Sequence, residues 1–199
     1  TTGANNVAIG ANTLGANTTA SNNTGLGTRA LQENTTGGLN TAVGTYSLDA
    51  NTNASGNTGC GYSTLTSNTT GQSNTAVGDQ ALASSTTADN NTAVGKDALG
   101  ANTTGAENAA LGMNALTTNT TGSYNTGLGR SALASNETAS YNTAVGYTAM
   151  SVNTTGANNT SVGYQALKGN TTGDSNTAVG AYSLDSNTTG SNNSAVGLR

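Results

Sequence analysis

The chain contains no histidine, proline, tryptophan or phenylalanine, and one cysteine among 199 residues. The absence of histidine excludes His-based catalytic triads and histidine-ligated zinc sites. A single cysteine excludes an intrachain disulfide, and the absence of proline excludes collagen and proline-rich linkers. No apolar run approaches the roughly 18 residues of a membrane span, so no membrane insertion is expected.

Charge is also scarce. Charged residues make up 7% of the chain and hydrophobic residues 33%, whereas ordinary domains have about 25% and 45–50%. Five Lys and Arg are too few to track a phosphate backbone, so no nucleic-acid partner is expected. Low charge also argues against typical disorder, which combines low hydrophobicity with high net charge.

A 17-residue repeat accounts for this composition. A five-residue motif, Asn-[Thr/Ser/Val/Ala]-[Ala/Gly/Ser]-[Val/Leu/Ile/Cys]-Gly, begins at Asn6. It recurs every 17 residues to Asn193, with no insertion. With that Asn as position 1, the unit reads N-T-A-V-G-x-x-A-L-x-x-N-T-T-G-x-x. Residues 1–199 therefore form a single repeat domain. We expect it to be a segment of a longer fibre, because neither end carries an atypical capping unit.

The side chains sort strictly by position in the repeat. Position 4 is apolar or Cys60, position 9 is Leu or Met150, and positions 3 and 8 are small. Charges occur only at positions 6, 7, 10, 11, 13, 16 and 17. This separation predicts a fixed inside and outside, with positions 4 and 9 buried.

Seventeen residues are too few for a helical hairpin or a propeller blade, but they accommodate short strands joined by turns. Positions 2–4 predict one strand, with Thr and Val on one side and Ala on the other. The Ala-Leu segment at positions 8 and 9 predicts a second strand, after a bend at the glycine of position 5. The fold class is therefore all-β, a parallel β-solenoid (β-roll) of about twelve coils.

Asparagine at positions 1 and 12 predicts ladders along the stack, because an amide can bond its copy in the next coil. Segments such as Asn17-Thr18-Thr19 also match the N-glycosylation sequon. If these asparagines point inward, the sequons are false positives.

No catalytic, metal-binding or cofactor-binding residue is predicted. Cys60 replaces the apolar residue of position 4, so we expect a buried, inert thiol. Asp79 and Asp97 lie on neighbouring coils beside Lys96, which favours surface charges over a glycosidase carboxylate pair. Calcium-binding β-rolls need a repeated Asp, which this unit lacks.

The repeat resembles known fibres along its whole length. Asn6-Val7-Ala8-Ile9-Gly10 and its later copies resemble the Asn-Ser-Val-Ala-Ile-Gly repeats of trimeric autotransporter adhesin heads. The full unit is also similar to repeat shafts of phage tail fibres and secreted bacterial fibres. The resemblance implies a left-handed β-roll and three chains side by side, although this repeat is longer than the usual adhesin unit.

Four tyrosines stand out from the repeat. Tyr124 and Tyr141 occupy position 17 of neighbouring coils, and Tyr147 and Tyr164 occupy position 6. Tyrosine offers an apolar ring with a polar tip, which suits sugars or protein partners. We predict a partner or glycan contact at these residues; lateral packing between chains and simple surface variation are the alternatives.

The sequence thus favours a structural fibre segment, extracellular or on a cell surface or virion, that gives a rigid rod for display and attachment. We expect its partners to be copies of itself, as a homotrimer or filament, because each coil buries little apolar area and uncovered small-residue faces favour association. A host-surface glycan or protein is a further expected partner. The chief alternative is ice binding through threonine rows at positions 2, 13 and 14, although position 2 shares a strand side with position 4. A solenoid enzyme is disfavoured, since the repeat has no loop insertions and no cluster of acidic and basic residues.

Overall fold

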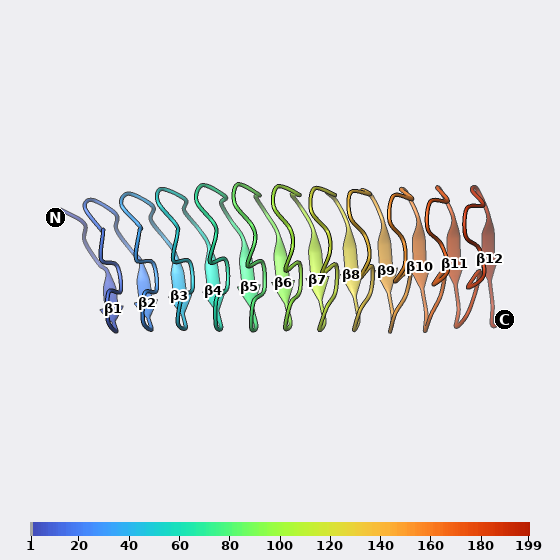
Figure 1. Ribbon diagram of the computed structural model, residues 1–199, viewed down its shortest axis with the longest axis horizontal. Helices are drawn as coiled ribbons and strands as arrows, with labels where there is room; N and C mark the ends of the chain where they lie inside the picture. Colours follow the sequence, from blue (N-terminus) through green and yellow to red (C-terminus); the bar gives the residue numbers. More distant parts are fainter. Residues whose placement is uncertain (1) are drawn as a thin grey trace.

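The computed structural model describes residues 2–199 as one β-solenoid with a single parallel sheet of twelve strands and no helix. Figure 1 shows the coils side by side along one axis, with the two termini at opposite ends. At a spacing of about 4.8 Å per coil, the rod is roughly 53 Å long. The strands are β1 Val7–Ile9, β2 Thr24–Leu26, β3 Thr41–Val43, β4 Thr58–Cys60, β5 Thr75–Val77, β6 Thr92–Val94, β7 Ala109–Leu111, β8 Thr126–Leu128, β9 Thr143–Val145, β10 Thr160–Val162, β11 Thr177–Val179 and β12 Ser194–Val196.

The predicted register is confirmed at every strand pair. Thr75 pairs with Thr92, Ala76 with Ala93 and Val77 with Val94, and all other neighbours are offset in the same way by one repeat unit. Identical positions therefore form continuous ladders along the rod. One strand per coil makes the sheet narrow and long.

The predicted second strand is absent. Around Leu99, the sign of φ alternates: it is positive at Gly95 (134°), Asp97 (56°) and Leu99 (51°), but not at Lys96 or Ala98. Local hydrogen bonds join Ala98 N–H to the Gly95 carbonyl (3.3 Å), whereas Leu99 N–H donates to Ala115 of the next coil (3.0 Å). Alternating left- and right-handed conformations make a chain of tight turns, so the Ala-Leu segment cannot extend as a strand.

The interior of the solenoid is narrow, and it contains both apolar and polar side chains. Leucine at position 9 is buried from Leu14 to Leu167, as predicted, and alanine at positions 3 and 8 packs against it. The asparagines of positions 1 and 12 are buried in the same interior. Position 15, Gly or Ala, closes the interior, and it is buried in most coils.

The two asparagine ladders are confirmed, and they meet at one carbonyl. Asn108 Nδ2 and Asn119 Nδ2 both donate to the Gly122 carbonyl, each at 2.9 Å. Asn108 Oδ1 accepts the backbone N–H of Asn125 in the next coil at 2.9 Å. These bonds tie the strand side of a coil to its N-T-T-G turn, and each coil to its neighbour.

The outward side of the sheet differs from the prediction. The middle residue of each strand points inward, so positions 2 and 4 both face out. Leu111 is 49% exposed and Val77 is 36% exposed. The prediction that position 4 is buried was wrong. An apolar residue indicates that a position disfavours water, but it does not indicate that the core of the same chain covers that position. Leucine at position 9 and the small residues fill the interior without it.

Replacement of Asn108 by alanine should destabilise the solenoid. The buried Asn125 N–H loses its partner, at about 1–3 kcal/mol. The Gly122 carbonyl keeps only the bond from Asn119 Nδ2, and the bond it loses contributes about 0.5–1.5 kcal/mol. We therefore expect a loss of about 1.5–4.5 kcal/mol in the free energy of unfolding, measured by urea denaturation. Asn53→Ala is the matched control, since Asn53 is exposed and its effect should stay within about 0.5 kcal/mol.

Gly112→Ala should be at least as damaging. The φ of Gly112 is 135°, and an added Cβ would lie 2.6 Å from the Gly129 carbonyl oxygen of the next coil. We expect about 3 kcal/mol or more of destabilisation in the same assay. Gly15→Ala should be nearly neutral, because its Cβ meets nothing closer than 3.4 Å. If Gly112→Ala leaves the free energy of unfolding nearly unchanged, the close approach of Gly112 to Gly129 of the next coil is contradicted.

Candidate functional site

The outer sheet face, made of positions 2 and 4 of β1–β12, is the most distinctive surface of the rod. It carries a ladder composed mainly of threonine beside an apolar ladder of Val, Leu, Ile and Cys60. None of these 24 positions (two in each of twelve strands) is charged. An exposed apolar surface of this continuity marks an interaction site on soluble proteins.

Cys60 lies on this face between Val43 and Val77, and its side chain is exposed. The prediction of a buried thiol was therefore wrong. The error follows directly from the wrong side being assigned to position 4. The same reversal removes the objection to threonine at position 2, which shares an exposed side with position 4 rather than a buried one.

The four predicted tyrosines form two stacked pairs. The Tyr124 and Tyr141 rings are parallel (2°) with centroids 4.9 Å apart, and the Tyr147 and Tyr164 rings are nearly parallel (8°) at 5.4 Å. All four are exposed, by 41–58%. Since position 17 precedes each strand and position 6 follows it, the pairs flank the outer sheet face on opposite edges and do not form one patch.

The position-6 row extends beyond its pair. The Arg130 guanidinium lies 5.7 Å from the Tyr147 ring centroid, and Tyr182 meets Tyr164 edge-on at 5.3 Å. Sequence reasoning missed Arg130 and Tyr182. The signal for Arg130 was its place at position 6, one coil before Tyr147, whereas Tyr182 sits at position 7 and only the turn geometry brings it to Tyr164.

Ring stacking limits what these tyrosines can bind. In each pair, the inner ring faces cover one another. Arg130 Nη1 donates to the Tyr147 hydroxyl (3.4 Å) and Gln165 Nε2 to the Tyr164 hydroxyl (3.3 Å), so the ring edges are the parts left for a partner. A sugar platform uses open ring faces. The arrangement therefore favours a protein partner that meets ring edges over a glycan that stacks along the row.

The position-17 edge is acidic. The pKa of Tyr124 is raised above its usual value, first by the negative charge of Glu107 and then by Tyr141. On the other edge, Tyr182 and burial raise the pKa of Tyr164. Within residues 2–199, neither Glu107 nor Arg130 has an ion-pair partner.

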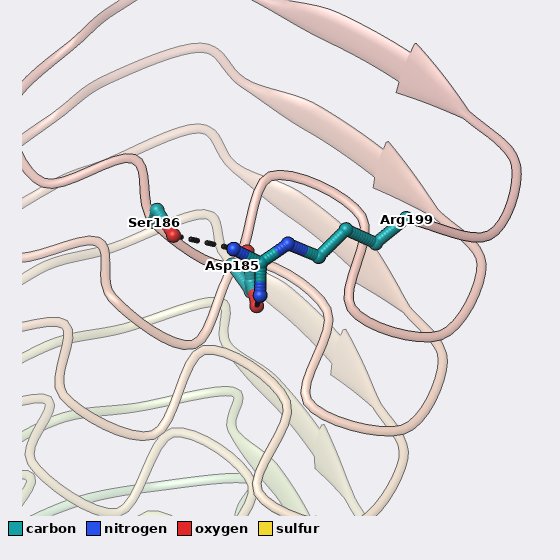
Figure 2. Close-up of polar contacts among 3 residues, drawn as sticks. All are labelled: Asp185, Ser186 and Arg199. Carbon is teal, nitrogen blue, oxygen red and sulfur yellow. Dashed lines mark hydrogen bonds and ion pairs between the residues drawn. The ribbon is translucent and has the colours of Figure 1, made fainter.

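Six of the other charged residues form three local surface pairs within residues 2–199. Lys96 Nζ lies 3.2 Å from Asp79 Oδ2, which confirms Asp79 as a surface charge, and this bond raises the pKa of Lys96. At the C-terminal end, Arg199 Nη1 lies 3.0 Å from Asp185 Oδ2. Figure 2 shows Arg199 extending over Asp185 and Ser186. Asp185 Oδ1 also accepts the Ser186 hydroxyl at 3.2 Å. Exposed pairs of this kind contribute little to stability.

An open depression of about 370 Å³ lies over the turns of three coils, and its lining includes Gln80, Asp97 and Asn114. Across residues 2–199, no group of three or more His, Cys, Asp or Glu side chains could hold a metal ion. In the same range, no helix is long and apolar enough to cross a membrane.

The sequon asparagines at position 12 point inward. Asn102 and Asn119 are fully buried, and their amides donate to carbonyls of the N-T-T-G turn. In the folded chain these side chains cannot accept a glycan, so these sequons are false positives.

Comparison with protein-family models, curated proteins and solved structures returned no match for this chain.

Glu107→Gln should lower the pKa of Tyr124 toward its usual value, because removal of the carboxylate charge makes the tyrosinate less unfavourable. Alkaline titration of tyrosinate absorbance, compared with and without Tyr124→Phe, isolates this residue from the other six tyrosines. Glu137→Gln is the control and should leave the titration unchanged. If the pKa of Tyr124 is unchanged in Glu107→Gln, the claim that Glu107 raises it is contradicted.

Proposed function

We propose that this chain is a non-catalytic segment of an extracellular, cell-surface or virion fibre, and that it forms a rigid rod by side-by-side association of identical chains. The observation that carries the proposal is the charge-free outer sheet face along all twelve strands. Charges occur at seven other positions of the unit, so their exclusion here indicates a face that is covered in use. The rod then displays its outward turns for attachment.

The size of the face supports a stable association. The outer sheet face together with its flanking rows at positions 17 and 6 is at most about 20 Å wide, so a rod of about 53 Å offers roughly 1,000 Å² per chain, with the charge-free ladders of positions 2 and 4 at its centre. Stable protein interfaces bury about 800 Å² per partner. The face also has the composition of an interface centre, which is depleted in charged residues.

The width of the face favours three chains. Six residue steps of about 3.3 Å separate positions 17 and 6, which is at most about 20 Å. Three such faces around a common axis place each sheet about 6 Å from it, close to half the sheet-packing distance of about 10 Å. Four faces would leave a channel too wide for Val and Thr to fill.

Leu111→Asp should reduce the native particle to a single chain. Leu111 is exposed in the isolated chain, so a carboxylate costs the fold little there, but it would be desolvated without a partner inside the assembly. Sedimentation equilibrium and circular dichroism measure mass and fold together. Thr104→Asp, at an exposed position 14, is the matched control and should retain the mass of the parent.

The reactivity of the Cys60 thiol reports independently on whether the outer sheet face is covered. Its thiol should react slowly with a maleimide in the parent assembly and rapidly in Leu111→Asp. A parent that is monomeric and reacts at the rate of the variant would contradict the proposal.

Ice binding is the second candidate, and one observation favours it. Threonine at position 2 projects outward from the strand on an uncharged parallel sheet, which provides a regular row of hydroxyl and methyl groups. Val7 and Ala109 interrupt that row. Thermal hysteresis of the monomeric protein, abolished by Thr92→Lys, would favour this function over association, because one face cannot be covered and bind ice.

A further inference from the structure

The two tyrosine stacks flank a common strand. Tyr141 lies two residues before β9, and Tyr147 lies two residues after it. No other strand has tyrosine on both flanks. One coil earlier, β8 is flanked by Tyr124 and Arg130, and β7 is preceded by Glu107. The two edges are therefore specialised at the same level of the rod.

The edges differ in charge. Glu107 makes the position-17 edge acidic beside Tyr124, whereas Arg130 makes the position-6 edge basic beside Tyr147. Neither charge has an ion-pair partner within residues 2–199. Arg130 Nη1 instead donates to the Tyr147 hydroxyl at 3.4 Å. Opposite charges left unpaired on opposite edges are the pattern of a head-to-tail interface between identical subunits.

We infer that the tyrosine stacks are the two halves of a seam between neighbouring copies of this chain; this inference rests on the proposed side-by-side association. Rotation about an axis parallel to the rod moves a chain without changing its height. In a ring of parallel chains, the position-17 edge of one copy thus meets the position-6 edge of the next at the level of the same strand.

The seam brings complementary groups together. Tyr141 of one copy meets Tyr147 of the next, and Tyr124 meets the next copy's Arg130. Glu107 then lies one coil, about 4.8 Å along the axis, from that Arg130. The ring edges left open by the stacks face the partner, and tyrosine and arginine are among the residues that most often dominate binding at interfaces.

Closure of the ring fixes the alignment of the chains. The ladders of positions 2 and 4 repeat nearly identically in every coil, so a slip by one coil would cost the sheet face little, and it would bring Glu107 level with Arg130 or with Lys96 of the next copy. Three such slips around a ring would leave a step of about 14 Å, which prevents closure. A closed three-chain ring therefore requires the parallel, level arrangement.

Chemical cross-linking tests the seam directly. In a Cys60→Ser background, the double variant Tyr141→Cys, Tyr147→Cys should give closed three-chain species with a short bismaleimide. Tyr141→Cys combined with Thr28→Cys is the matched control, because Thr28 occupies position 6 seven coils away, about 34 Å along the axis. That control and each single variant should give no cross-linked chains.

The outcomes separate this inference from the proposed function. Cross-linking of the single variants would mean that like edges meet, which overturns the seam. A three-chain mass by sedimentation without cross-linking of the double variant overturns the seam and leaves the proposed association intact. A single-chain mass by sedimentation overturns both the seam and the proposed association.

A charge swap gives a second readout. Glu107→Arg should raise the dissociation constant of the assembly by about tenfold or more, because each of three seams loses an attraction and gains a repulsion. Adding Arg130→Glu should bring the dissociation constant back to within about threefold of the value for the unmodified protein. Glu33→Arg, on the turns away from the seam, should have no effect. Failure of the swap to restore assembly contradicts the pairing.

Discussion

The buried asparagine amide is the interaction on which the rest of the structure depends. One amide at position 1 donates to the turn carbonyl of its own coil and accepts the backbone N–H of the position-1 asparagine in the next coil. A second ladder at position 12 donates to that same carbonyl and to its own copy one coil away. The unit must therefore keep its length, since one added residue would move an amide off its carbonyl and leave buried polar groups without partners.

This polar interior explains the composition of the chain. A coil that buries one leucine, two alanines and two asparagines needs few large apolar residues, and it leaves most positions to small polar turn residues. Because hydrogen bonds run along the stack, each coil depends on its neighbours, as in other repeat proteins. The apolar residues that the interior does not use stand on the outer sheet face.

Much of the fold could be predicted from the repeat. The parallel register, buried Leu99 and the Asn108 ladder all follow from period and residue type. The second strand could not be predicted, because a leucine such as Leu99 with positive φ has no signature in the sequence. The side taken by Val77 was also hidden, since apolarity alone does not distinguish a core from an interface. The tyrosines were identified, but their separation onto two edges required the path of the strand.

The mass and shape of the unmodified native particle test the central claim most directly. Light scattering with electron microscopy should give three times the chain mass of 19.3 kDa in rods whose cross-section has threefold symmetry. Longer rods of the same cross-section would add end-to-end stacking to the same association. A stable particle of 19.3 kDa at micromolar concentration, with its sheet face open to water, would contradict the account.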